Sequence, residues 1–288
     1  MSENFFDEMI SKIASDVEKN SRSDTDYIAS DGLLHCGKCH APKQIRMKLN
    51  GMKEKVLPVM CDCMKADIAK QEEAKKRDEK RKKIEHLREN SLIDKRYENC
   101  SFETITVTDD NRKQVRICKR YAVKFEELYK SNQGLLLYGD VGTGKTVLAC
   151  CIANYLMEHL HSVYSTSFVE ILRHSQGFNH DEKEEIIQRR MRTAELVILD
   201  DLGAERGTDY GLEVVYNIID GRYRSGKPMI VTTNLSLMQM QNPDDVRYER
   251  IYQRVLHVCY PIMFAGKSFR LKEAANRYDA IKSLLEDV

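Results

Sequence analysis

The chain reads Gly139-Asp140-Val141-Gly142-Thr143-Gly144-Lys145-Thr146 directly after a short apolar run, residues 135–138. This is the phosphate-binding pattern G-x-x-x-x-G-K-[ST] in the context expected for it, between a strand and a helix. Glycines let successive backbone N–H groups face phosphates, and the following helix presents its positive dipole end to them. We predict that residues 139–146 bind ATP, with Lys145 reaching the β- and γ-phosphates and Thr146 holding Mg²⁺.

Two acidic residues follow a second apolar run. Residues 196–199 are all apolar and lead directly into Asp200 and Asp201. This pattern is typical of a buried parallel strand that delivers carboxylates at its C-terminal edge, where open α/β sheets bind ligands. We assign Asp200 to the Mg²⁺ side of the site and Asp201 to polarisation of the attacking water. Glu205 is a reserve candidate for that water, and helix capping is the alternative role for Asp201 and Glu205.

A third strand is expected at residues 229–233 and ends at Asn234. Asn234 is a candidate for orienting the attacking water or sensing the γ-phosphate, with a simple turn as the alternative. Between these strands we expect helices over residues 147–161 and 184–193, and a further strand over 163–168. The alternation of strands and helices predicts an α/β fold.

The overall composition limits what the chain can do. Its 288 residues include 46 Lys and Arg against 45 Asp and Glu, so any contact with nucleic acid must be local. The length allows one good core and a smaller module. The first 20 residues fit neither a signal peptide nor a transit peptide, and no apolar stretch is long enough to span a bilayer. A cytoplasmic location is expected, where the nine cysteines are metal ligands or buried apolar residues rather than disulfides.

Four of the cysteines form two close pairs, Cys36-x-x-Cys39 and Cys61-x-Cys63. Two such knuckles that face each other make a tetrahedral thiolate site for zinc, and metal binding would supply much of the folding free energy of this small segment. Free thiols in a flexible module are the alternative. His40 completes a C-x-x-C-H pattern of c-type haem attachment, but that chemistry requires export. We treat His40 as a bystander.

Two helices are expected around this cysteine cluster. Residues 3–19 carry apolar side chains at helical spacing, so they predict an amphipathic helix that packs on the zinc module or on another protein. Residues 70–90 are nearly all charged, with acids and bases one helical turn apart in the favourable order. This second segment is expected to be a solvated helical connector that leads into the nucleotide-binding domain near residues 92–102.

Together these motifs resemble bacterial and phage helicase loaders of the DnaC/DnaI type, in the AAA+ superfamily alongside the transposition ATPase IstB. The resemblance is carried by GDVGTGKT at Gly139, LVILDDLGAE at Leu196, IVTTN at Ile230, ERIYQRV at Glu249 and GKSFR at Gly266. It implies a P-loop ATPase domain with a parallel five-stranded sheet over residues 96–288. Before this domain it implies an N-terminal amphipathic helix and zinc-binding module over 1–65, and a charged helical linker over 66–95.

The resemblance also implies roles for three arginines. Arg254 looks like the arginine finger, which would reach the γ-phosphate bound by a neighbouring subunit and stabilise the charge of the transition state. Arg250 lies one helical turn earlier and is the competing choice. Arg270 resembles the sensor arginine that acts on the phosphates of its own subunit. A surface salt bridge is the alternative for each.

The function implied by the resemblance is loading of the replicative helicase. An ATPase, slow and stimulated by DNA or a partner, would bind the hexameric helicase through its N-terminal module and deliver it onto single-stranded DNA. Its ATP sites, completed by neighbouring subunits, would control self-association. Two alternatives stay open: a transposase-assisting ATPase like IstB, and a nucleotide-dependent binding adaptor with negligible turnover. The adaptor stays open because this chain has Asp201 at the position where many ring-forming ATPases have Glu.

Overall fold

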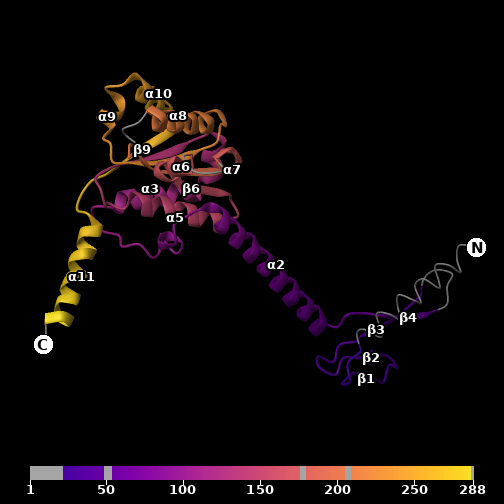
Figure 1. Ribbon diagram of the computed structural model, residues 1–288. Coiled ribbons are helices and arrows are strands. Elements are labelled where there is room, and N and C mark those ends of the chain that lie inside the picture. The colour runs from indigo at the N-terminus through magenta and orange to yellow at the C-terminus, as the bar shows by residue number, and fades with distance from the viewer. Residues whose placement is uncertain (1–21, 49–53, 176–179, 205–208, 287–288) are drawn as a thin grey trace, which may run out of the picture. The chain divides into compact units, whose positions relative to one another are not determined.

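The computed structural model describes residues 22–48, 54–175, 180–204 and 209–286 (Figure 1). The chain divides into two compact units, Met1–Arg81 and Lys82–Val288. The helix predicted over residues 3–19 lies outside the described residues. Each helix that is described is too short or too polar to cross a lipid bilayer.

The described residues of the first unit form two antiparallel pairs of short strands. These pairs are β1 (Tyr27–Ile28) with β2 (Leu34–His35), and β3 (Gln44–Met47) with β4 (Lys55–Pro58). The apolar side chains that its described residues bury are Leu34, Cys36 and Cys61. Among the described residues this apolar core is small, and modules with small cores depend on another source of stability, such as a metal.

A single helix, α2 (Asp62–Ser91), occupies most of the segment predicted as a charged linker over residues 66–95. It is 30 residues long, and Ser91 at its end is its buried residue. An ion pair joins Arg81 Nη2 to Asp78 Oδ1 at 2.8 Å, one turn apart on the exposed surface. The helix is therefore solvated as expected, while the domain boundaries at residues 65 and 95 stay predictions.

The second unit is built on a parallel five-stranded sheet with the strand order β6-β7-β8-β5-β9. The strands are β5 (Gly134–Gly139), β6 (Val163–Ser167), β7 (Leu196–Leu202), β8 (Met229–Thr233) and β9 (Cys259–Phe264). The helical elements are η1 (Lys95–Tyr97), α3 (Arg112–Val123), α4 (Phe125–Lys130), α5 (Lys145–Glu158), α6 (Phe168–Ser175), α7 (His180–Thr193), α8 (Asp209–Arg224), α9 (Leu237–Gln241), α10 (Val246–Val258) and α11 (Phe269–Glu286). The predicted α/β class and five-stranded parallel sheet are confirmed.

Helices cover both faces of this sheet, as a buried parallel sheet requires. On β5, Leu136 packs in one apolar cluster with α8 and α10, whereas Leu135 and Leu137 pack in another with α3 and α5. Figure 1 shows these two pairs of helices on opposite sides of the sheet. The thiols expected to pack in the interior do so: Cys118, Cys150, Cys151 and Cys259 are buried and Cys100 is half-buried.

A buried arginine holds one end of the sheet together. Arg222 of α8 is 0% exposed, and its guanidinium makes five hydrogen bonds of 2.6–3.2 Å. The acceptors are the backbone carbonyls of Met191, Ala194, Glu195 and Pro228. Burial lowers the pKa of Arg222 to about 10, so the side chain is still cationic at neutral pH. It connects the C-terminal end of α7 to the segments that enter β7 and β8.

The strand order places the predicted site at one edge of the sheet. β8 lies between β5 and β7, so the carboxyl ends of the three strands are neighbours. Those ends carry the phosphate-binding loop after β5, the acids of β7 and Asn234 after β8. This is the edge at which open α/β sheets bind ligands.

Candidate functional site

The phosphate-binding loop is held in a tight conformation by its glycines and by contacts with the end of β9 and the start of α11. Gly142 has φ +78°, and a Cβ added there would lie 2.1 Å from the Oγ of Ser268. The N–H of Phe269 donates to the carbonyl of Gly142 at 2.9 Å, and the N–H of Asp140 donates to Phe264 at 2.9 Å. A larger residue at position 142 would therefore be strained by this backbone conformation and would displace the Ser268 side chain.

Lys145 begins helix α5 and is buried, with 6% of its surface exposed. Its ammonium donates to the carbonyls of Gly139 and Asp140 at 2.9 and 2.6 Å, and to Oδ1 of Asn234 at 2.9 Å. Burial lowers the pKa of Lys145, while the negative charge of Asp201 opposes that shift. The structure thus brings together the predicted lysine and asparagine, although the role of Asn234 toward the attacking water stays a prediction.

The residues predicted for Mg²⁺ are also in contact. Thr146 Oγ1 donates to Asp200 Oδ1 at 2.9 Å. A hydroxyl that donates its one proton keeps lone pairs for a metal ion, and Mg²⁺ prefers such hard oxygen ligands. Burial raises the pKa of Asp200, and hydrogen bonds from Thr232 and Thr146 counteract the shift by stabilising the carboxylate. This pair of oxygen donors beside Lys145 fits Mg²⁺ bound with a nucleotide.

Asp201 is exposed and has an unusual backbone conformation, with φ +58°. It lies inside β7, and its N–H donates to the hydroxyl of Thr232 at 3.0 Å. Asp201 is part of a strand, so the described residues give no support to the alternative that it caps a helix. Glu205, the reserve candidate, lies outside the described residues.

The predicted finger, Arg254, is held within its own subunit. From α10 it donates through Nε to Asp220 Oδ1 at 2.9 Å and through Nη2 to the hydroxyl of Tyr216 at 3.0 Å, both on α8. Its guanidinium also lies over the Tyr216 ring, 4.9 Å from the centroid. The competing candidate, Arg250, is exposed and accepts a hydrogen bond from Arg254 Nη1 through its backbone carbonyl at 2.8 Å.

Arg270, the predicted sensor, is the second residue of α11 and begins the helix beside the phosphate-binding loop. Burial and the nearby acids have the larger effects on the pKa of Lys145, and the positive charge of Arg270 lowers it further. Burial raises the pKa of Asp200, and the charge of Arg270 opposes that increase. The structure therefore places Arg270 near the loop of its own subunit.

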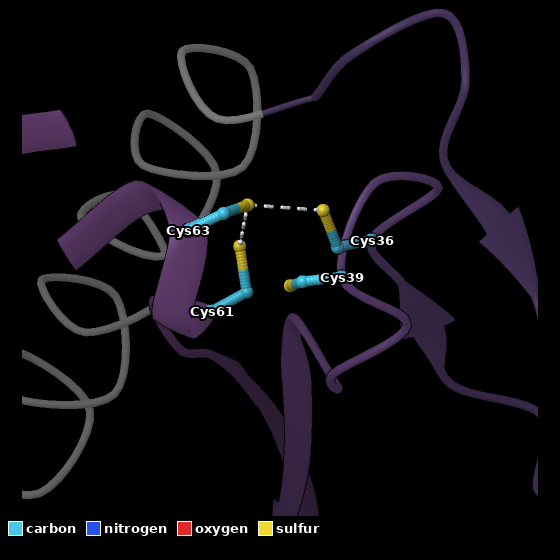
Figure 2. A group of neighbouring side chains, drawn as sticks. All are labelled: Cys36, Cys39, Cys61 and Cys63. Carbon is cyan, nitrogen blue, oxygen red and sulfur yellow. Dashed lines mark hydrogen bonds between the residues drawn. The ribbon is translucent and has the colours of Figure 1, made fainter. Parts of the chain in front are cut away.

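The four cysteines of the first unit converge on one point (Figure 2). All four sulfurs lie within 4.8 Å of one another, with Cys63 Sγ 3.4 Å from Cys36 Sγ and 3.3 Å from Cys61 Sγ. Hydrogen bonds from the backbone of Cys63 and then Ala41 lower the pKa of Cys39 to about 6. The hydrogen bonds with the Cys61, Cys36 and Cys39 side chains instead raise the pKa of Cys63 to about 12. Four sulfurs gathered at one point are the donor set of structural zinc sites, so these residues fit zinc.

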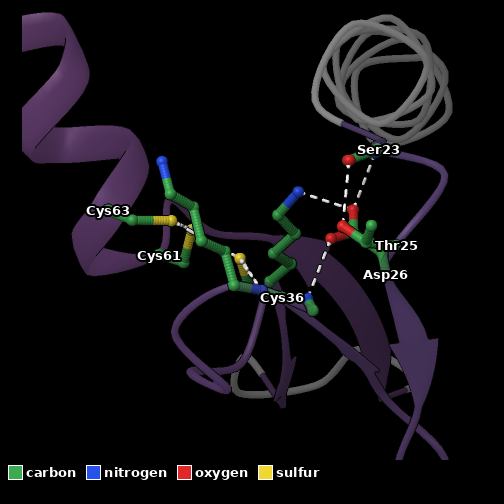
Figure 3. Close-up of polar contacts among 9 residues, drawn as sticks. Ser23, Thr25, Asp26, Cys36, Cys61 and Cys63 are labelled. Carbon is green, nitrogen blue, oxygen red and sulfur yellow. Dashed lines mark hydrogen bonds and ion pairs between the residues drawn. The ribbon is translucent and has the colours of Figure 1, made fainter.

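A polar network supports the first knuckle (Figure 3). The carboxylate of Asp26 accepts from the N–H groups of Ser23 at 2.8 Å and Gly37 at 3.3 Å, and from Lys43 Nζ at 2.6 Å. These bonds lower the pKa of Asp26 although burial opposes them. His40 Nδ1 bonds the hydroxyl of Tyr27 at 3.1 Å, which fits its role as a bystander.

Sequence reasoning missed several of these residues. Asp26 and Lys43 carry no local pattern that would mark them as neighbours of the cysteines. Asp220 and Tyr216 are spaced as one helical turn of α8, which alone does not indicate that they contact Arg254. Thr232 had a signal, because a hydroxyl that follows the apolar run of a buried strand requires a hydrogen-bond partner.

Comparisons with known proteins agree with this architecture. The replicative helicase loader DnaC of Buchnera aphidicola subsp. Schizaphis graminum is 29% identical over 170 residues, covering 58% of this chain and 68% of that protein. The loader DnaI of Bacillus subtilis is 26% identical over 213 residues, covering 68% and 66%. A crystal structure of DnaI superposes with a TM-score of 0.52 at 26% identity, covering 61% of this chain and 96% of the other.

A family model supplies the remaining evidence. The model described as IstB-like ATP binding protein matches residues 61–277, which include the phosphate-binding loop, the acids of β7, Asn234, Arg254 and Arg270. This match spans well over half of the chain. The chain therefore belongs to the family of IstB-like ATP-binding proteins.

Proposed function

We propose that this protein is an ATP-dependent loader that binds the hexameric replicative helicase and delivers it onto single-stranded DNA. The observation that carries the proposal is the convergence of Lys145, Thr146, Asp200 and Asn234 at the carboxyl edge of the sheet. That geometry suits a magnesium nucleotide, and two relatives of this chain are named as replicative helicase loaders.

The chemistry assigned to the site follows from its contacts. The loop N–H groups and Lys145 would bind the phosphates, and Thr146 with Asp200 would hold Mg²⁺. Mg²⁺ bound by these two side chains would supply positive charge to balance that of the nucleotide phosphates. Asp201 would polarise the attacking water, and Arg270 would contact the phosphates in the same subunit. Arg254 would complete the site of a neighbouring subunit.

The first unit supplies the helicase-binding part of the proposal. Zinc held by Cys36, Cys39, Cys61 and Cys63 would order a module whose described residues bury few apolar side chains. A metal-ordered module with solvated strands is suited to binding a protein partner. ATP would hold loader subunits together, and hydrolysis would release the helicase.

The test is a pull-down of the full chain, with ATP, against the replicative helicase and the transposases of its host. We expect binding to the helicase, and loss of that binding when zinc is chelated. Binding to a transposase instead of the helicase would favour the second candidate, a transposase-assisting ATPase, which is supported by the IstB-like family match.

Hydrolysis separates both candidates from a nucleotide-dependent adaptor. We expect slow release of phosphate that single-stranded DNA or the helicase stimulates. If ATP binds but no phosphate is released with either addition, the adaptor is the correct assignment and Asp201 is not a catalytic group.

A further inference from the structure

A buried threonine connects the two acids of the candidate site. Thr232 lies on β8 and is 0% exposed. Its Oγ1 donates to Asp200 Oδ1 at 2.6 Å and accepts from the N–H of Asp201 at 3.0 Å. Since a backbone N–H can only donate, it occupies a lone pair of the hydroxyl, and the hydroxyl proton is directed to the carboxylate.

The contact exists because β7 contains a bulge. Leu199 pairs with Val231 and Leu202 pairs with Thr233, so Asp200 and Asp201 together stand opposite the single residue Thr232. A bulge leaves an extra residue outside the regular ladder and changes the direction of its side chain, and bulges are common beside active sites. Here the extra residue has φ +58°, and its N–H donates to the threonine side chain.

Asp200 is held from two elements at once. Thr146 of α5 and Thr232 of β8 donate to the same oxygen, Oδ1, at 2.9 and 2.6 Å. A carboxylate oriented by two fixed donors loses little freedom when it joins a metal's coordination shell, and such supporting bonds are a recognised determinant of metal affinity. Thr232 therefore contacts both the carboxylate of Asp200, assigned to Mg²⁺, and the backbone of Asp201, assigned to the attacking water.

We propose that Thr232 is a positioning residue of the magnesium-nucleotide site, whose hydroxyl orients Asp200 for the metal and stabilises the bulge that directs Asp201. This inference rests on the Mg-ATP site of the proposed function. It concerns the hydroxyl alone, because the methyl group of Thr232 packs in the interior whatever the site binds.

Two comparisons isolate the hydroxyl: the wild type with Thr232→Val, and Thr232→Ser with Thr232→Ala. Thr232→Val keeps the shape of the side chain without the hydroxyl, whereas Thr232→Ser keeps the hydroxyl without the methyl group. Thr232→Ala compared with Thr232→Ser differs by the hydroxyl only, so this pair decides the question if the valine variant fails to fold. Thermal melting without nucleotide reports folding of each full-length protein.

The readout is equilibrium binding of a fluorescent, non-hydrolysable ATP analogue as Mg²⁺ is titrated. We expect Thr232→Val and Thr232→Ala to need about 10- to 100-fold more Mg²⁺ for half-maximal enhancement of binding, and Thr232→Ser to match the wild type. Binding without Mg²⁺ should be the same in all four proteins, because the hydroxyl contacts acids rather than the phosphate-binding loop.

Two results would overturn the inference. One is equal Mg²⁺ dependence in folded Thr232→Val and wild type, and the other is equal impairment of the serine and alanine variants, which would assign the effect to packing. Failure of the wild type itself to bind the analogue at any Mg²⁺ concentration would instead refute the proposed function. The two failures are thus distinguishable.

Discussion

Arg254 and Asp220 form a two-point contact, in which Nε and Nη2 of the arginine lie 2.9 and 2.8 Å from the same carboxylate oxygen, Oδ1. The other oxygen, Oδ2, pairs with Arg224 Nε at 2.8 Å. Asp220 is mostly buried, with 14% of its side chain exposed, so the ion pair is less screened than one on the open surface. The predicted finger is consequently held in one orientation on its own subunit.

The first prediction concerns that finger. If Arg254 acts across a subunit junction, Arg254→Ala should lower stimulated ATP hydrolysis on the order of 10³-fold, since it removes the charge that stabilises the transition state. Mixing this variant with Lys145→Ala subunits, which keep the finger but lack a working loop, should restore part of the phosphate release. Arg250→Ala is the matched control and should hydrolyse ATP nearly as the wild type does. If Arg250→Ala instead lost more ATP hydrolysis than Arg254→Ala, Arg250 would be the arginine finger.

The second prediction concerns Arg222. Arg222→Met keeps a long buried side chain but leaves the carbonyls of Met191, Ala194, Glu195 and Pro228 without their donor. Because unsatisfied buried polar groups are costly, the free energy of unfolding should fall by about 3 kcal/mol or more in urea denaturation. Arg224→Met, an exposed arginine two residues away, should change it by less than about 1 kcal/mol. Similar values for the two variants would contradict the structural role given to Arg222.

The third prediction concerns metal content. Elemental analysis of the purified protein should find one zinc per chain, and Cys63→Ser should lower that content because it removes one of the four clustered sulfurs. Cys259→Ser is the control, since this buried thiol lies in the sheet of the second unit and should leave zinc unchanged. Full zinc occupancy in Cys63→Ser would mean that the ligand set is wrong.

The fourth prediction is a conflict between stability and function at Asp200. Burial raises its pKa in the folded state, so ionising it at neutral pH costs folding free energy. Without Mg²⁺, Asp200→Asn should therefore be more stable than the wild type by on the order of 1 kcal/mol at pH 7. The direction of this difference follows from the raised pKa, because the wild type becomes more stable as the pH falls through the pKa of Asp200 in the folded state. The difference between the two proteins should disappear below about pH 3, where the carboxyl is protonated in both states.

Urea unfolding of both proteins from pH 7 to about pH 3 in the presence of a chelator measures this difference. A wild type that is the more stable protein at pH 7 would show that the hydrogen bonds from Thr146 and Thr232 outweigh the cost of burying the charge. The same variant should lose the Mg²⁺ enhancement of nucleotide binding.

Much of the second unit could be predicted from the sequence because its signals are local. The loop pattern needs glycines and a lysine at fixed spacing, and buried parallel strands are continuous apolar runs, so residues 135–138, 196–199 and 229–233 were recognisable as strands. The order of those motifs along the chain indicated the sheet edge at which Lys145, Asp200 and Asn234 meet. The cysteine pairs were recognisable for the same reason, since metal ligands recur at short spacing.

Tertiary structure alone decided the contacts between residues distant in the chain. The bonds of Thr232 to Asp200 and Asp201 depend on the register of β7 against β8, and a bulge has no sequence pattern of its own here. Asp220 reaches Arg254, and Arg222 reaches the end of α7, because helices pack across one face of the sheet. Local chemistry therefore determined which residues form the site, whereas strand register and helix packing determined which side chains hold them in place.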